Sequence, residues 1–228
     1  MSTFLILAGG ASTRFDGDKL AERFNGMTLP QYCAKFALAN GADRICVTLS
    51  ERQVYTDGIA FFHRILDDLH EVCEPEIALQ PADRYGTGVA VSIWQQRIME
   101  DVVILFGDNF YSGTLPMMAS SETLYYTTVT RSQSQMQNLQ LAAVIDDFVI
   151  EKPHSQLRGR FFAGFIKMPA QMWNVLPGLR RSSRNEYEVT DIINSAERRV
   201  AIDLSETYMI WDSITFASDV QRIQNLLM

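Results

Sequence analysis

The sequence lacks the features of several broad protein classes. It has 20 Lys and Arg against 27 Asp and Glu, a formal net charge of −7, so the basic face of a nucleic-acid-binding protein is not expected. Its longest apolar runs, such as residues 102–106, are far too short to cross a bilayer. No basic stretch precedes the first apolar run, as it would in a signal peptide. We therefore expect a cytoplasmic protein that binds neither nucleic acid nor membrane.

Cysteine is scarce, and repeats are missing. Cys33, Cys46 and Cys73 do not have the spacing of a metal or redox motif, and the first two lie in apolar patterns typical of buried thiols. No internal repeat, low-complexity segment or linker divides the chain. Because 228 residues with 47% hydrophobic content can bury one large core, we expect one domain. Its halves would span about 1–120 and 121–228.

The first half has the alternating pattern of an α/β fold. Its predicted strands are 4–8, 44–49, 76–80 and 101–106, with a weaker candidate at 59–65. Its predicted helices are 29–40 and 89–99, and residues 9–28 predict a loop. Such alternation is typical of a mainly parallel sheet flanked by helices, where ligands bind beyond the carboxyl ends of the strands. We therefore expect the loops after Ala8, Gln80 and Phe106 to converge on one cleft.

The second half is richer in β-structure. Its predicted strands are 124–130, 139–145, 148–151, 160–167 and 202–204. Its predicted helices are 169–176, 189–198 and 215–227. We expect this half to form a smaller β-rich lobe that binds a second substrate and packs on the first half.

A Gly-rich loop follows the first predicted strand. Gly9 and Gly10 let the backbone come close to a ligand, and such a loop can present N–H groups to a phosphate. Side chains that add hydroxyl donors or positive charge follow: Ser12, Thr13, Arg14 and Lys19. The loop lacks the endings of a Walker loop and of a dinucleotide-binding fingerprint. Its glycines alone are also compatible with an ordinary turn beside two solvated cations.

Polar motifs lie at two other predicted strand ends. Gly107-Asp108-Asn109 follows residues 101–106, where a carboxylate can bind Mg²⁺ as a hard oxygen ligand. A simple turn is the alternative interpretation. In Glu151-Lys152-Pro153, the lysine could bind a phosphate and the glutamate could accept hydrogen bonds from hydroxyl groups, or both could form an exposed ion pair.

Three motifs precede predicted helices. In residues 184–191, Arg184 is a candidate phosphate ligand, whereas the acidic residues could simply stabilise the start of a helix. Residues 211–215 precede the last predicted helix and could supply its N-cap. Gln80 is followed by Gly86-Thr87-Gly88, in which an amide could pair with a base and glycines could give the base room.

Taken in the order of the chain, the motifs resemble those of nucleotidyltransferases of the sugar-1-phosphate type along nearly the whole chain; they lie near residues 7–19, 80–88, 107–109, 151–153, 184–191 and 211–215. The likeness is to glucose-1-phosphate thymidylyltransferases of the short form, without a C-terminal β-helix. The resemblance implies a Rossmann-like, GT-A-like fold and a Mg²⁺-dependent reaction in nucleotide-sugar and polysaccharide biosynthesis. In that reaction a nucleoside triphosphate and a sugar 1-phosphate yield a nucleotide sugar and pyrophosphate.

The resemblance also implies roles for individual residues. Nucleotide-binding residues would be Leu7, Ala8, Gly9, Gly10, Ser12, Thr13, Arg14, Gln80, Gly86, Thr87, Gly88 and Asp108. Acceptor-binding residues would be Asn109, Glu151, Lys152, Gly164 and Arg184. Metal ligands would be Asp108 and Asp212. Catalysis would rest on positioning and charge neutralisation by Arg14, Lys19, Asp108 and Lys152.

The sequence departs from the family pattern in ways that leave alternatives open. Ala11-Ser12 replaces a small-Gly pair, Asn185 and Ile214 replace glycines, and Lys19 comes early. The short spacing from Arg14 to Lys19 also resembles guanylyl- and cytidylyltransferases that act on non-sugar phosphates or phosphonates. A catalytically silent nucleotide-binding relative is a further alternative, and a glycosyltransferase is disfavoured because no Asp-x-Asp follows a buried strand. The base, the acceptor and a homo-oligomeric state stay open.

Overall fold

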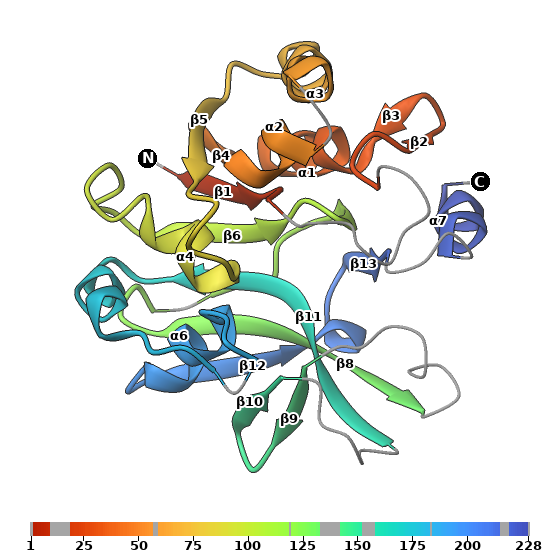
Figure 1. The fold of residues 1–228 in the computed structure, drawn as a ribbon. Helices are drawn as coiled ribbons and strands as arrows, with labels where there is room; N and C mark the ends of the chain where they lie inside the picture. The colour runs from red at the N-terminus through yellow and green to blue at the C-terminus, as the bar shows by residue number, and fades with distance from the viewer. Residues whose placement is uncertain are drawn as a thin grey trace.

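The structure is a computed structural model that describes residues 2–9, 19–56, 59–118, 120–132, 142–151, 158–182, 184–214 and 219–227. One nine-stranded sheet runs through it (Figure 1). Seven strands follow one another across this sheet: β10 (Phe148–Ile150), β9 (Ala143–Ile145), β11 (Arg158–Met168), β6 (Val102–Phe106), β1 (Thr3–Leu7), β4 (Arg44–Ser50) and β5 (Glu76–Gln80). The other two are β8 (Leu124–Ser132), which pairs with β11, and β12 (Arg199–Asp203), which pairs with β8.

Strand β1 lies at the centre of a parallel part of the sheet. It pairs with β4 on one side and β6 on the other, and β4 pairs in turn with β5, all in parallel. Its apolar side chains alternate between two cores, because successive residues of a strand point to opposite faces. Phe4 and Ile6 belong to one core, and Leu5 and Leu7 belong to the other. Burial on both faces explains the continuous apolar run of this strand.

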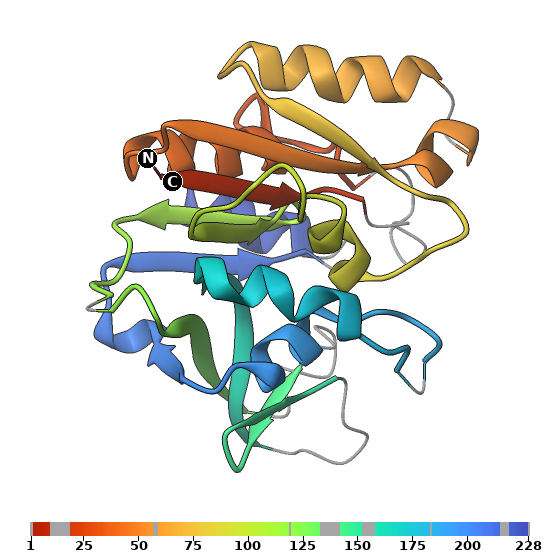
Figure 2. The ribbon, with the colours of Figure 1, turned by 90° about the vertical axis from the view of Figure 1, so that its left-hand side faces the viewer.

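Helices cover both faces of the sheet. α1 (Leu29–Ala39) and α3 (Ile59–His70) contribute to the core that contains Phe4, whereas α4 (Thr87–Ser92) and α6 (Val189–Ser195) contribute to the core that contains Leu5. Figure 2 shows the second pair on the face turned toward the viewer. The predicted α/β fold class is therefore confirmed. Among the described residues, no helix has both the length and the apolar character needed to cross a bilayer.

The second half extends the sheet of the first half. β11 pairs antiparallel with β6, and also antiparallel with β8 and β9. β12 pairs with β8 in parallel. The sheet is therefore mixed, and its shared strands make one continuous body of the two halves.

Two small ribbons and a last helix lie beside the sheet. β7 (Asn109–Gly113) pairs with β13 (Met209–Ser213), and β2 (Arg23–Phe24) pairs with β3 (Met27–Thr28). α7 (Val220–Leu226) packs on them through a third core. That core consists of Phe24, Leu29, Phe110, Ile214 and Ile223.

Several predicted elements are wrong in type or extent. Residues 59–65 belong to the helix α3 rather than to a strand, because Phe61, Ile65 and Leu69 recur at helical spacing and are buried. The helix predicted at 169–176 is a pair of short 3₁₀ turns, η1 (Ala170–Asn174) and η2 (Leu176–Gly178). α4 ends at Ser92 rather than continuing to 99. The sequence patterns did not indicate α2 (Glu51–Thr56), η3 (Leu204–Glu206) or the two ribbons.

Candidate functional site

The ends of three strands meet in one pocket, as expected. The pocket forms where β1, β5 and β6 end, because parallel strands bring their carboxyl ends to one edge of the sheet. Its lining comprises Leu7, Ala8, Gly9, Lys19, Leu20, Gln80, Tyr85, Gly86, Thr87, Ala90, Phe106, Asp108 and Glu186. The nucleotide-binding residues predicted within the described part of the chain all line this pocket, apart from Gly88.

The ends of β1 and β6 are held close together. The Gly107 N–H donates to the Leu7 carbonyl at 2.9 Å, and the Ala8 N–H donates to the Thr48 carbonyl at 2.8 Å. A Cβ on Gly107 would lie 2.8 Å from the Ala8 Cβ, so only glycine fits between the strands at this point. This close approach brings Asp108 beside the end of β1.

Lys19 and Asp108 form an ion pair at the mouth of the pocket. The Lys19 Nζ lies 2.6 Å from the Asp108 Oδ2, and it also donates to the Ile214 carbonyl at 3.0 Å. The lysine side chain is 13% exposed and the aspartate side chain 36% exposed. Asp108 thus reaches the pocket, while Lys19 places a partly shielded cation beside it.

Asn109 lies beneath Asp108 and not on the pocket wall. Its amide fits with Nδ2 directed to the Asp108 Oδ1 at 3.1 Å and with its oxygen directed to the Trp211 Nε1 at 3.1 Å. A Cβ on Gly164 would lie 2.2 Å from this amide oxygen. Gly164, at φ 68°, also accepts a hydrogen bond from the Tyr111 hydroxyl through its carbonyl, at 2.5 Å. In this structure Asn109 therefore supports Asp108, and Gly164 packs against Asn109 and Tyr111, so neither of these two predicted acceptor-binding residues lines the pocket.

Gln80 organises the loop that follows β5. Its side chain is buried, and its Nε2 donates to the Arg84 carbonyl at 3.0 Å and to the Gly86 carbonyl at 3.1 Å. These two bonds use both amide hydrogens, so the group left to face a ligand is the Oε1. Gly9 packs against that oxygen, because a Cβ there would lie 3.1 Å from it.

Residues 85–88 and 187–189 form a clasp between the two halves of the chain. The Gly88 N–H donates to the Tyr187 carbonyl at 2.8 Å, and the Tyr187 N–H donates to the Tyr85 carbonyl at 3.2 Å. The Thr87 Oγ1 accepts from the Val189 N–H at 2.9 Å. A Cβ on Gly86 would lie 2.2 Å from the Tyr187 carbonyl oxygen. The predicted base-binding glycines thus give room to the Tyr187 segment.

Arg184 lies among three carboxylates. Its guanidinium donates to Glu186 and to Glu188 at 3.1 Å and lies 3.5 Å from Glu151. Burial raises the pKa of Glu188 to about 7, and the neighbouring Glu151 and Glu186 also raise it, whereas Arg184 and the Ser182 hydroxyl lower it. Glu186 lines the pocket that contains Asp108. The predicted acceptor side therefore borders the predicted nucleotide side directly.

Only one of the two predicted metal ligands has the surroundings of a Mg²⁺ ligand. Asp108 is the better fit, because its side chain is 36% exposed at the pocket, a cation of the described chain contacts only one of its oxygens, and the other oxygen has amide support. Asp212 does not fit: its side chain is 10% exposed, and Arg222 donates to both of its oxygens, at 2.6 and 3.0 Å. Among the residues that the structure describes, no group of three His, Cys, Asp or Glu side chains could hold a metal ion.

Some predicted site residues fall outside the described part of the chain: Gly10, Ser12, Thr13, Arg14 and Lys152. The sequence did not single out several polar residues at or near the site. Tyr85 and Glu186 line the pocket, and Arg222 binds Asp212. Glu186 lies inside the motif at residues 184–191, so the sequence could have indicated it. For Arg222 the sequence offers only its position three residues after Asp219 on a predicted helix.

Comparisons with known proteins show what the chain is similar to. Residues 4–98 match the MobA-like NTP transferase domain. A comparison with curated proteins gives no match.

Solved structures match over the whole chain. One, described as a glucose-1-phosphate thymidylyltransferase from Bacillus anthracis in complex with sucrose, shares 15% identity at a TM-score of 0.77, covering 99% of this chain and 95% of that one. The inositol-1-phosphate CTP transferase from T. maritima shares 16% identity at a TM-score of 0.74, covering 100% and 95%. A UDP-glucose pyrophosphorylase in complex with UDP-glucose shares 13% identity at a TM-score of 0.74, covering 100% and 98%.

At these identities the likeness to solved structures establishes the fold, while the match over residues 4–98 concerns the part that carries the end of β1, Lys19 and Gln80. Together they confirm the expected resemblance: part of the chain is similar to an NTP transferase domain, and the whole chain has the fold of these three structures.

Proposed function

We propose that the protein transfers a nucleoside monophosphate from a nucleoside triphosphate to a sugar 1-phosphate or a related polyol phosphate, with Mg²⁺ as cofactor. The observation that carries this proposal is the composition of the pocket. It joins the end of β1, the loop after β5 and Asp108 with Glu186 from the predicted acceptor segment. A triphosphate and a phosphorylated acceptor could therefore meet at one place.

The reaction requires positioning and charge neutralisation rather than a protein nucleophile. An oxygen of the acceptor phosphate forms a bond to the α-phosphorus while the bond to the bridging oxygen breaks, and pyrophosphate leaves with the electron pair. Lys19 supplies positive charge beside Asp108. Mg²⁺ held by Asp108 would neutralise phosphate charge. Arg14 would add a further cation on the triphosphate.

On the acceptor side, Arg184 would bind the phosphate. Its present partners are Glu151, Glu186 and Glu188, so an incoming phosphate would compete with carboxylates for the guanidinium. Carboxylates left near the acceptor could then accept hydrogen bonds from its hydroxyl groups. Lys152 would contribute a second cation to the same phosphate.

The similar structures act on acceptors of this chemical class. Their names include glucose 1-phosphate and inositol 1-phosphate, and one contains UDP-glucose. The MobA-like match and the CTP transferase also support the second candidate, a guanylyl- or cytidylyltransferase with a non-sugar acceptor. A protein that binds nucleotide without turnover is the remaining alternative.

A pyrophosphate-release assay tests the proposal. Purified protein with Mg²⁺ would be given GTP, CTP, UTP or dTTP in combination with glucose 1-phosphate, inositol 1-phosphate or phosphocholine. We expect release that depends on both substrates, and the productive pair separates the two candidates. Thermal stabilisation by a nucleotide without any release would instead indicate a silent binding protein.

Two variants test whether the release of pyrophosphate depends on the pocket. Asp108→Ala should lower turnover by about a hundredfold or more, because the transition-state charge loses several kcal/mol of stabilisation. Asp101→Asn is the matched control, since Asp101 lies at the opposite end of β6, where it accepts from the Ala170 N–H. Near-normal turnover of Asp108→Ala would contradict the proposed mechanism.

A further inference from the structure

Arg222 of α7 holds the end of β13 through three hydrogen bonds. Its Nε and Nη2 donate to the two oxygens of Asp212 at 2.6 and 3.0 Å, and its Nη2 also donates to the Ser213 carbonyl at 2.7 Å. Its Nη1 donates to Asp219 at 2.7 Å. Bidentate pairs of this kind are among the stronger ion pairs of a carboxylate, and they also fix its orientation. Asp212 is therefore committed to a side chain of the last helix.

The next residue of the chain contacts both members of the ion pair in the pocket. The Ile214 N–H donates to the Asp108 carbonyl at 3.2 Å, and the Ile214 carbonyl accepts from the Lys19 Nζ at 3.0 Å. Ile214 is buried and belongs to the same core as Ile223 of α7. The position of Lys19 relative to Asp108 thus depends on where α7 holds Ile214.

The environment of Asp212 disfavours a divalent cation. Its Oδ1 accepts from the Ser213 N–H at 2.8 Å as well as from Arg222. A metal ion at this carboxylate would have to displace the guanidinium or lie beside it against like-charge repulsion. Arg222 also has Asp219 as a second carboxylate partner, which further disfavours its displacement.

We propose that Arg222 is a positioning residue for the reaction. Together with Asp212 it forms a brace that fixes Ile214, and through Ile214 it fixes Lys19 against Asp108. In this arrangement Asp212 serves the brace and is not a ligand of Mg²⁺. The inference rests on the proposed function for its kinetic consequence, but the brace itself can be tested without turnover.

The first test is a double-mutant cycle followed by hydrogen exchange. Arg222→Met, Asp212→Asn and the double variant should each raise the exchange rate of the Ile214 amide by about tenfold or more, as measured by NMR. The double variant should exchange no faster than either single variant, because each change removes the same brace. Gln221→Met, an exposed position on α7, is the matched control and should leave the rate unchanged.

The second test uses Mn²⁺ alone as a probe of the metal site, measured by electron paramagnetic resonance. Asp108→Asn should weaken Mn²⁺ binding by about tenfold or more, whereas Asp212→Asn and Arg222→Met should change it by less than about twofold. Weakening by Asp212→Asn as large as that by Asp108→Asn would overturn the assignment of Asp212.

Turnover separates a positioning role from a purely structural one. Arg222→Met should lower kcat by about tenfold or more while leaving KM for the triphosphate nearly unchanged. Arg222→Lys should restore part of kcat, since an ammonium can still bond to Asp212. An unchanged Ile214 exchange rate in Arg222→Met would overturn the brace even if transfer is observed. If the wild-type protein shows no nucleotidyl transfer with any substrate pair, the proposed function is refuted. The exchange rate of the Ile214 amide would still show whether the brace exists.

Discussion

Glu188 is a buried carboxylate at the start of a helix, and its surroundings favour the protonated form. It is the N-cap residue of α6, and its side chain is 4% exposed. The charged and polar groups that face it are Glu151, Glu186, Arg184 and the Ser182 hydroxyl. Burial is the largest cause of the raised pKa, which reaches about 7. The net charge of the predicted acceptor side therefore changes around neutral pH, because Glu188 gains or loses its proton there.

The raised pKa of Glu188 predicts a pH-dependent stability. Between its ordinary pKa of 4.5 and about 7, the folded protein keeps a proton that the unfolded chain has lost. The stabilisation from this proton is present below pH 4.5 and disappears as pH rises through 7. Glu188→Gln cannot titrate, so the wild-type free energy of unfolding should fall relative to the variant by on the order of 1–3 kcal/mol across this window.

Urea unfolding at intervals from pH 4.5 to 8 measures this difference. Glu122→Gln is the matched control, because Glu122 is 71% exposed and its variant should run parallel to the wild type. A Glu188→Gln curve that also runs parallel to the wild type would show that Glu188 ionises with its ordinary pKa in the folded protein.

At the scale of elements, the clasp between residues 85–88 and 187–189 joins α4 to α6 and depends on one glycine. Gly86 has φ 123°, and a Cβ there would lie 2.2 Å from the Tyr187 carbonyl oxygen and 2.5 Å from its nitrogen. Both atoms belong to the backbone, so no side-chain rotation could relieve the contact. Gly41, which follows α1, has φ 79° but nothing within 4 Å of a Cβ.

This contrast predicts different costs for the same substitution. Gly41→Ala should lower the free energy of unfolding by about 1 kcal/mol, the cost of a left-handed backbone alone. Gly86→Ala should lower it by about 3 kcal/mol or more, since the clasp must open or the backbone must shift. Urea denaturation of both variants measures the difference. Equal losses would show that the Tyr187 segment moves away at little cost and does not hold the halves together.

Elements with local signals were predictable from the sequence. In α1, Thr28 forms a capping box with Gln31, Pro30 occupies the first turn and Gly41 follows the end, and the predicted range was nearly correct. Asn25-Gly26 is a further local signal, typical of a tight hairpin turn, and it would have indicated the β2–β3 ribbon. Buried strands such as β1 and β6 were recognisable from their apolar runs because both of their faces are covered.

Elements that depend on distant partners could not be predicted in this way. β7 and β13 exist because Asn109–Gly113 and Met209–Ser213 pair across almost the whole chain. The pairing of Arg222 with Asp212 likewise depends on how α7 docks on the third core. For this reason the sequence correctly placed Asp212 before the last helix, but it could not show that Arg222 binds the Asp212 carboxylate.

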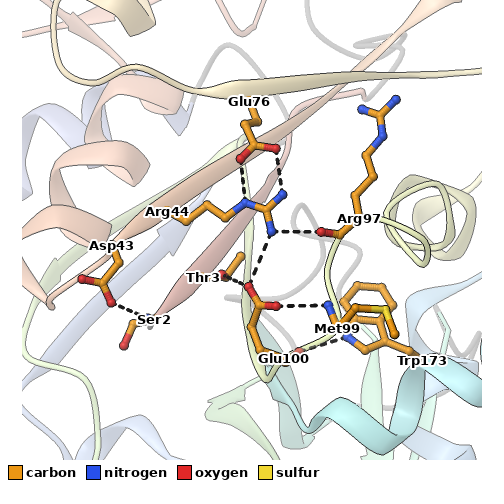
Figure 3. A network of polar contacts seen from close by, with 9 residues as sticks. All are labelled: Ser2, Thr3, Asp43, Arg44, Glu76, Arg97, Met99, Glu100 and Trp173. Carbon is orange, nitrogen blue, oxygen red and sulfur yellow. Dashed lines mark hydrogen bonds and ion pairs between the residues drawn. The ribbon is translucent and has the colours of Figure 1, made fainter.

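At the scale of the whole molecule, the edge of the sheet opposite the pocket carries its own polar network (Figure 3). Arg44 donates to both oxygens of Glu76 at 2.7 Å and to the Arg97 carbonyl at 3.0 Å. Glu100 accepts from the Thr3 hydroxyl at 2.5 Å, and its carbonyl accepts from the Trp173 Nε1 at 3.0 Å. The network joins the amino ends of β1, β4 and β5 to η1 of the second half.

Because this network lies at the opposite strand ends from the pocket, it should stabilise the fold without affecting transfer. Arg44→Ala leaves Glu76 and Glu100 without their guanidinium partner, so we expect a loss of about 1–3 kcal/mol in the free energy of unfolding at pH 7. Hydrogen bonds from Arg44 lower the pKa of Glu76, and the Thr3 hydroxyl lowers that of Glu100. Carboxylates with lowered pKa values stabilise above their ordinary value of 4.5, and this stabilisation is lost as pH falls.

The loss in Arg44→Ala should therefore shrink below about pH 4. Arg198→Ala is the matched control, because Arg198 pairs with Glu122 at 3.3 Å with both side chains more than two-thirds exposed, and its removal should cost less than about 1 kcal/mol. Urea unfolding at pH 3.5 and 7, together with KM for the triphosphate at pH 7, measures both effects. A large rise in KM in Arg44→Ala at a temperature where the variant is fully folded would mean that the two edges of the sheet are coupled, and that the strands transmit a displacement from their amino ends to the pocket.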